Sequence, residues 1–222
     1  MGRRARGVSV GLVGAVALAS AGAAMADKEK VHLTAAGQAA ARAAVVRRAD
    51  LGAAPGWTGG MKKPTLSGGT LACPGFNPKQ SDLVLNGAAE SVWKNGGIEI
   101  DSEAQVLQTA QMVRLDWQRT VLAPQVISCL RRSITNQLPA SARLVSVRRR
   151  AFPKVATFAR AYRIVTDVTV NGRTIPIMFD FVLVGTRRTE ITLMTTAPLA
   201  GAAPVAAAEL RLAVLLVHRA RA

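Results

Sequence analysis

The feature that most restricts the fold of this sequence is a pair of long alternating segments joined by Asn171 and Gly172. Asn and Gly both accept the positive φ angles of a type I′ turn, so this dipeptide is a strong hairpin signal. Residues 158–170 alternate before it, and the returning segment places apolar residues on one face: Ile175, Ile177, Phe179, Phe181 and Leu183. The sequence therefore predicts a long antiparallel β-hairpin with one buried face.

Further strands are predicted around this hairpin. Gly96 and Gly97 form a turn between two of them. These strands are expected at residues 83–93, 98–107, 143–151 and 190–196. In contrast, residues 51–81 are dense in glycine and proline, which interrupt regular structure, so we expect a long loop there.

Helices are predicted where apolar residues recur at steps of three and four. Thr34 is a plausible N-cap for the first of these helices. The first is expected at residues 34–48, and the second begins at Thr109 and has Val113 and Trp117 on its buried stripe. Two more helices are expected at residues 126–138 and 205–219. Glu209 and Arg211 argue against a membrane span in the last one. Runs of strands with helices between them indicate an α+β fold, a twisted antiparallel β-sheet packed against helices.

The first 26 residues have the pattern of a signal peptide. Three arginines precede an uncharged run at residues 8–24, and Ala24 and Ala26 supply the small pair that signal peptidase requires. A retained anchor helix is the alternative, but a run of roughly 17 residues is short for a bilayer core of about 30 Å. We therefore expect cleavage after residue 26 and an extracytoplasmic chain, secreted or associated with the cell wall, that starts at Asp27.

The sequence has two cysteines, Cys73 and Cys129. In an exported protein of this size, two cysteines most simply form one disulfide bond. Such a bond would hold the loop at 51–81 against the helix at 126–138. Two free thiols are the alternative.

The net charge of +16 favours anionic partners. Export places nucleic acid out of reach, so phospholipid head groups or an anionic wall polymer are the expected partners. A basic cluster forms the candidate site for such a surface: Arg148, Arg150, Lys154 and Arg160. Arginine binds phosphate and carboxylate groups in a bidentate manner. Charges on an edge strand also prevent unwanted pairing between sheets. The cluster can therefore be a binding surface for an anionic partner or a protection of the sheet edge, and both interpretations stay open.

Catalytic signatures are absent from the sequence. The two histidines, His32 and His218, lie near opposite ends and belong to no HExxH motif, and no GxSxG elbow or phosphate-binding loop is present. Asp167 and Asp180 could face each other across the hairpin, although such carboxylates more often face solvent. We therefore predict no catalytic residue, no metal site and no cofactor.

Several short motifs carry a resemblance to a known family. They are Cys73-Pro74-Gly75-Phe76, Ser81-Asp82-Leu83, Gly87-Ala88, Ala110 and Cys129-Leu130, followed by the late meander. With these motifs, residues 66–219 resemble exported sensor-like domains such as the extracellular domains of PknH-type receptor kinases, which have a PsbP-like fold.

The resemblance implies an α/β/α sandwich with a cleft for a small or wall-derived ligand, and it supplies no catalytic residue. It also implies a domain at residues 66–222, preceded at residues 27–65 by a helix and the Gly/Pro-rich loop. The kinase domains that this chain resembles are framed by two disulfide bonds, whereas this chain can form only one. The shape of the cleft therefore does not transfer in detail.

These observations together predict an exported cell-envelope protein that binds or senses a ligand without catalysis. Trp57 and Trp93 are the candidate residues of the ligand cleft, and a pocket lined by residues 51–81 and Trp93 would favour this function. A structural envelope component is one alternative and would show a featureless surface. An exported hydrolase is the other and would show clustered histidines and carboxylates. The partner is an anionic polymer or lipid, or an unknown small ligand.

Overall fold

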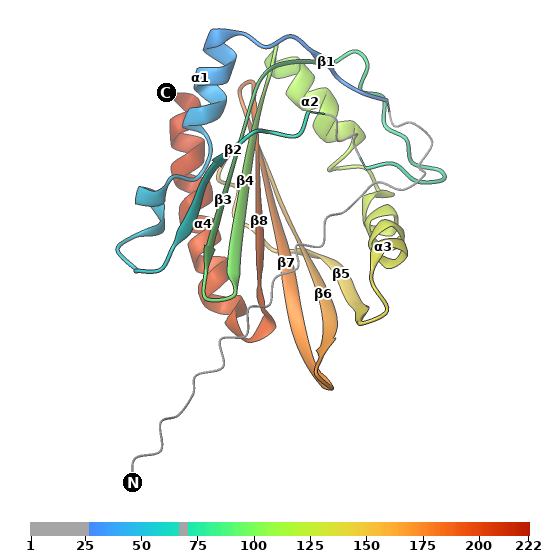
Figure 1. Ribbon diagram of the computed structural model, residues 1–222. Coiled ribbons are helices and arrows are strands. Elements are labelled where there is room, and N and C mark those ends of the chain that lie inside the picture. Colours follow the sequence, from blue (N-terminus) through green and yellow to red (C-terminus); the bar gives the residue numbers. More distant parts are fainter. Residues whose placement is uncertain (1–26, 67–70) are drawn as a thin grey trace.

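The computed structural model describes residues 27–66 and 71–222 of the chain. The predicted signal peptide and its cleavage site lie outside these residues. The described residues form an eight-stranded sheet with the order β1-β3-β4-β8-β7-β6-β5, in which β2 also pairs with β3. The α+β fold class predicted from the sequence is confirmed (Figure 1).

The strands are β1 Lys30–Val31, β2 Thr58–Lys62, β3 Val84–Asn95, β4 Ile98–Leu107, β5 Ala142–Arg150, β6 Phe158–Val170, β7 Arg173–Thr186 and β8 Thr189–Pro198. The helices are α1 Ala35–Ala43, α2 Ala110–Arg119, α3 Val126–Gln137 and α4 Ala202–Arg221. The hydroxyl oxygen of Thr34 accepts a hydrogen bond from the backbone N–H of Gly37, which confirms the predicted N-cap of α1. The helix ends at residue 43, earlier than expected.

The predicted hairpin is present as β6 and β7. Asn171 and Gly172 have φ angles of 51° and 73°, and Val170 pairs with Arg173 across the turn. Two strands were not expected from the sequence. β2 lies inside the segment predicted as a loop, and β1 pairs with β3 in parallel, so the sheet is mixed rather than purely antiparallel.

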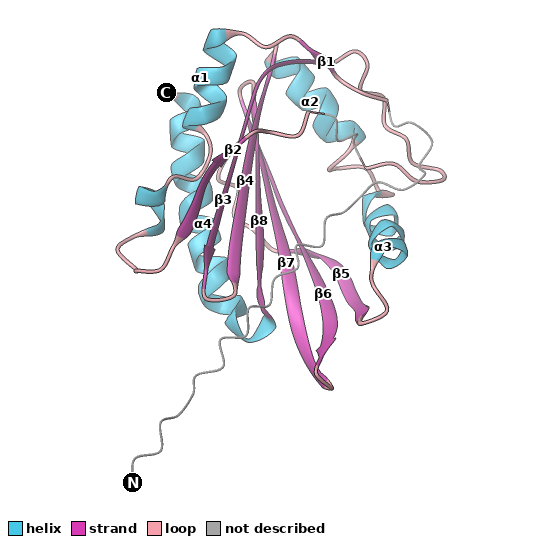
Figure 2. Ribbon diagram, viewed as in Figure 1, coloured by secondary structure: helices cyan, strands magenta, loops and turns pink. Residues whose placement is uncertain are grey.

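Helices cover both faces of the sheet (Figure 2). α1 and α4 pack on one face, called here the α4 face, where a large buried cluster includes Val182 and Leu193 from the strands with Leu212 and Leu216 from α4. α2 and α3 lie on the opposite face, called here the α2 face. A smaller cluster around Trp117 fills the space under α2.

The segment before the predicted domain boundary is part of the same core. It supplies β1, α1 and β2 to the sheet and its α4 face. Val45 and Val46 are fully buried in the cluster that also contains Leu216 of α4. Residues 27–62 and the rest of the described chain therefore pack as one unit.

By length and composition, α4 is apolar enough to cross a membrane. Glu209, Leu212 and Leu216 on this helix are buried against the sheet. The apolar side chains of α4 thus serve the core of the domain.

Candidate functional site

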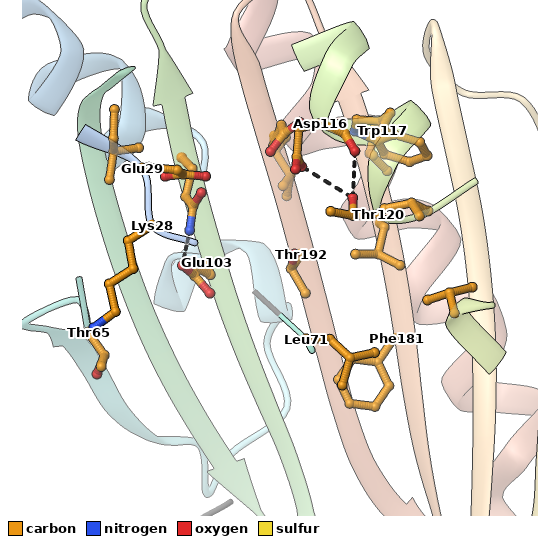
Figure 3. Close-up of a pocket in the computed structure, with 18 of the residues that line it drawn as sticks. Lys28, Glu29, Thr65, Leu71, Glu103, Asp116, Trp117, Thr120, Phe181 and Thr192 are labelled. Atoms are coloured by element: carbon orange, nitrogen blue, oxygen red, sulfur yellow. Dashed lines mark hydrogen bonds between the residues drawn. The ribbon is translucent and has the colours of Figure 1, made fainter. Parts of the chain in front are cut away.

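A cavity of about 860 Å³ lies on the α2 face of the sheet. It is lined by residues of strands β1, β3, β4, β6, β7 and β8, of α2 and α3, and of irregular segments at residues 27–29, 65–66 and 71–76 (Figure 3). Cavities that hold small molecules in proteins typically measure about 300–1,000 Å³. The size of this cavity makes it the candidate functional site.

The strand register determines which side chains form the floor of the cavity. Glu103 of β4 pairs with Thr192 of β8, and Thr192 pairs in turn with Leu183 of β7. Residues paired across neighbouring strands share a face of the sheet, so these three point toward the same space. Along this row the floor changes from a carboxyl to an apolar side chain.

One part of the cavity, the apolar half, is lined by Leu71, Val126, Leu130, Tyr162, Phe181 and Leu183. Leu71 lies beside Phe181 (Figure 3). Trp117 of α2 closes this part from above and stacks on Phe158, with ring centroids 5.1 Å apart. A Cβ atom at Gly185 would lie only 2.6 Å from Nε1 of Trp117, so the glycine allows the indole to lie directly on the sheet.

A disulfide bond between Cys73 and Cys129 holds two walls of the cavity together, as the sequence predicted. Their Cα atoms lie 5.9 Å apart and their sequence separation is 56 residues. Phe76, from the irregular segment, and Leu130, from α3, both line the cavity close to this bond. The bond therefore fixes the irregular segment against α3.

The other part of the cavity, the acidic half, is lined by Glu29, Glu103, Asp116 and Glu190 (Figure 3). Glu103 accepts a hydrogen bond of 2.8 Å from Nε2 of Gln105, and Asp116 accepts one of 2.9 Å from Nε2 of Gln80. The Oε1 atom of Glu190 is buried and has no hydrogen-bond partner among the described residues. This half of the cavity thus contains an unsatisfied acceptor.

Burial and mutual repulsion raise the pKa values in the acidic half. Burial, followed by the charges of Asp116 and Glu103, raises the pKa of Glu29 to about 7. Burial, followed by Asp116 and Glu29, raises the pKa of Glu190 well above its ordinary value of 4.5. The pKa values of Glu103 and Asp116 are also raised, in each case mainly by burial. The acidic half therefore retains protons at higher pH than ordinary carboxyls do.

The acidic half is not matched by basic side chains. Five of the thirteen acidic residues of the chain line the cavity, whereas Lys28 is the one lysine or arginine in the described part that does so. Asp27, the fifth, accepts hydrogen bonds from the backbone N–H groups of Gln80 and Ser81. These contacts anchor the segment that carries Glu29.

The predicted cleft residues do not line this cavity. Trp93 lies on the α4 face, where its Nε1 donates a hydrogen bond of 3.0 Å to the carbonyl oxygen of Val46. Trp57 packs against the same buried cluster. The structure does not bring these two residues to the cavity, because both indoles pack against the buried cluster of the α4 face.

The four residues of the predicted basic cluster do not form one surface. Arg150 points under α4, where it bonds to Glu209 and keeps only 17% of its side chain exposed. Arg148 pairs with a residue on the α4 face, whereas Arg160 pairs with Leu183 on the α2 face. Arg148 and Lys154 are exposed. A docking edge that includes Arg150 is therefore excluded by its buried ion pair.

Asp167 and Asp180 do not face each other. Asp180 lies opposite Arg163, whose Nε donates a hydrogen bond of 2.7 Å to it, and Asp167 lies opposite Pro176. The sequence did not identify the carboxyls of the acidic half, since they come from separate segments. The one local signal was the acidic residues at 103 and 190, on the polar side of predicted strands.

Comparisons with known proteins add little to this description. No protein-family model matches the chain, and no curated protein matches it. Among solved structures, it is similar to LpqN of Mycobacterium tuberculosis, which is described as involved in cell envelope biogenesis. The sequences are 11% identical, the match covers 72% of this chain and 83% of LpqN, and the TM-score is 0.28. The proposals below therefore rest on the cavity.

Proposed function

We propose that this protein is an exported cell-envelope protein that binds a small, partly apolar ligand without transforming it. The observation that carries this proposal is the cavity of about 860 Å³ with its apolar half. Transfer of apolar ligand surface out of water into such a space is favourable by roughly 25 cal/mol per Å². Tyr162, Phe181 and Leu183 supply the walls against which this surface would pack.

An extracytoplasmic location agrees with two features of the chain. The first 26 residues have the sequence pattern of a signal peptide. The bond between Cys73 and Cys129 is of the kind that persists in oxidising compartments outside the cytoplasm. The same bond shapes the cavity, so export and ligand binding are linked in this proposal.

Binding rather than catalysis is supported by the hydroxyl group of Tyr162, which lines the cavity. A catalytic hydroxyl needs a neighbouring base that accepts its proton. The hydroxyl of Tyr162 instead donates a hydrogen bond of 2.8 Å to the carbonyl oxygen of Val121.

One observation favours an exported hydrolase as the second candidate function. The charge of Asp116 raises the pKa of Glu190, and neighbouring carboxyls with raised pKa values can act as acid and base. This function predicts that envelope-derived esters or glycosides are hydrolysed by the protein and that Glu190→Gln abolishes the hydrolysis. Ligand binding without turnover would exclude it.

The binding function can be tested with N-phenyl-1-naphthylamine, an uncharged apolar probe whose fluorescence rises in apolar sites. We expect saturable binding by the purified protein. Thr192 lies at the centre of the cavity floor, so Thr192→Phe should fill the space and weaken probe binding at least tenfold. Thr174→Phe, on the exposed end of the same sheet, is the matched control and should bind normally.

Circular dichroism and thermal unfolding would show that both variants are folded. Equal probe binding by Thr192→Phe, Thr174→Phe and the parent protein would overturn the proposal. Absence of saturable binding by the parent would overturn it as well.

A further inference from the structure

The two halves of the cavity differ in polarity along a defined direction. The row from Glu103 through Thr192 to Leu183 crosses three neighbouring strands. Strands in a sheet lie about 4.8 Å apart, so the acidic and apolar ends of this row are about 10 Å apart. A ligand that fills both ends must itself be polar at one end and apolar at the other.

The acidic half lacks a compensating positive charge. Glu29, Glu103, Asp116 and Glu190 line it, and Lys28 is the one basic neighbour among the described lining residues. The buried Oε1 of Glu190 accepts no hydrogen bond from the described residues. A buried acceptor without a donor costs about 1–3 kcal/mol, which a donating ligand group would recover.

The chemistry of the site distinguishes among possible polar groups. A cationic head group stabilises the ionised form of these carboxyls, whereas an anionic one would be repelled by each carboxyl that ionises. A metal ion is disfavoured because the described residues contain no group of three or more acidic, histidine or cysteine side chains placed to hold one. An ammonium group carries three donors and a positive charge and can be followed by an apolar chain.

We infer that the cavity binds a cationic amphiphile, with its ammonium group in the acidic half and its alkyl chain on Phe181, Leu183 and Leu71. This inference rests on the proposed function and specifies its ligand class. The positive charge of the ammonium group would lower the pKa values of Glu103 and Glu190, so that both carboxyls ionise and accept its hydrogen bonds. The chain would extend toward α3.

The test compares three ligands with the same ten-carbon chain: decylamine, 1-decanol and decanoate. Each displaces N-phenyl-1-naphthylamine from the purified protein at pH 7 and low salt, below its aggregation concentration. We expect decylamine to bind at least tenfold more tightly than decanol, and decanoate to bind most weakly. Screening should reduce the preference for the amine as salt increases.

Glu103→Gln combined with Glu190→Gln should lower the affinity for decylamine to about that for decanol. Glu99→Gln is the matched control. Glu99 lies on the same strand and face as Glu103, but its carboxylate pairs with Lys94 at 2.8 Å. This variant should retain the preference for the amine. Glu103→Gln alone provides the same comparison, with a smaller loss, if the double variant does not fold.

The outcomes separate this inference from the proposed function. Binding of decanol without tighter binding of decylamine would overturn the cationic ligand and leave the apolar binding function intact. A preference for the amine that survives in the folded double variant would also overturn it. If neither the probe nor any ten-carbon ligand binds, both proposals are wrong.

Discussion

The acidic half of the cavity should make the stability of the protein fall as the pH rises. Burial and the neighbouring charges of Asp116 and Glu103 raise the pKa of Glu29 from its ordinary value of 4.5 to about 7. The folded protein therefore binds more protons than the unfolded chain between these two pH values. Stability must decrease over this interval, because the unfolded chain ionises Glu29 at lower free-energy cost.

The size of the effect follows from the pKa values. Each pH unit between the unfolded and folded pKa corresponds to 1.36 kcal/mol, so Glu29 alone accounts for a loss of about 3 kcal/mol. The loss begins near pH 4.5 and is complete above pH 7. Glu29→Gln cannot ionise, so the variant should gain about 2–3 kcal/mol relative to the parent between pH 5 and pH 8.

Urea unfolding of both proteins at several pH values measures this difference directly. Glu99→Gln serves as the control, because Glu99 is paired with Lys94, and it should show a difference from the parent that does not grow with pH. If the stability curves of Glu29→Gln and the parent run parallel between pH 5 and pH 8, then the carboxyl of Glu29 is not desolvated in the folded protein and the reasoning is refuted.

Three further predictions concern the frame of the cavity and the α4 face. Replacing Cys73 and Cys129 by serine should destabilise the protein by about 4 kcal/mol, because the disulfide bond closes a loop with a sequence separation of 56 residues in the unfolded chain. The same replacement should weaken probe binding. Urea unfolding measures the first effect and probe titration the second. Arg150→Met should cost about 3–5 kcal/mol because it leaves a buried carboxylate on α4 unpaired, whereas exposed Arg148→Met should change stability by less than about 0.5 kcal/mol. Gly185→Ala should lower Tm and alter the near-ultraviolet circular dichroism of the indole above it, and an unchanged spectrum would contradict the packing described.

Local sequence patterns predicted those elements that have their own periodicity. The β6–β7 hairpin followed from its alternation and from the turn residues Asn171 and Gly172. β2 has the sequence Thr-Gly-Gly-Met-Lys, which lacks such alternation. It is a strand because the long edge of β3 offers unpaired backbone groups beyond its short contact with β1, and that partner is not visible in the local sequence.

The alternation of apolar residues in β7 led to a wrong prediction of which face of the strand is more deeply buried. The face with Phe179 and Phe181 was predicted to be the buried one, but these side chains are only partly buried. Met178, Val182 and Val184, on the opposite face, are almost fully buried under α4. Both faces of β7 are apolar because helices cover both, and the incompletely filled face contains the cavity.

The contrast between the two faces is the strongest argument that the acidic half serves a ligand. On the α4 face, the buried carboxylates of Asp180 and Glu209 contact the guanidinium groups of Arg163 and Arg150. On the α2 face, Glu190 is buried beside other carboxyls and no arginine lines the cavity among the described residues. A chain with a net charge of +16 has ample arginine for both faces. The fold pairs acids with arginine where they are sealed in the core, and among the described residues it lines the cavity with five acids and one lysine, which is the arrangement that a cationic ligand requires.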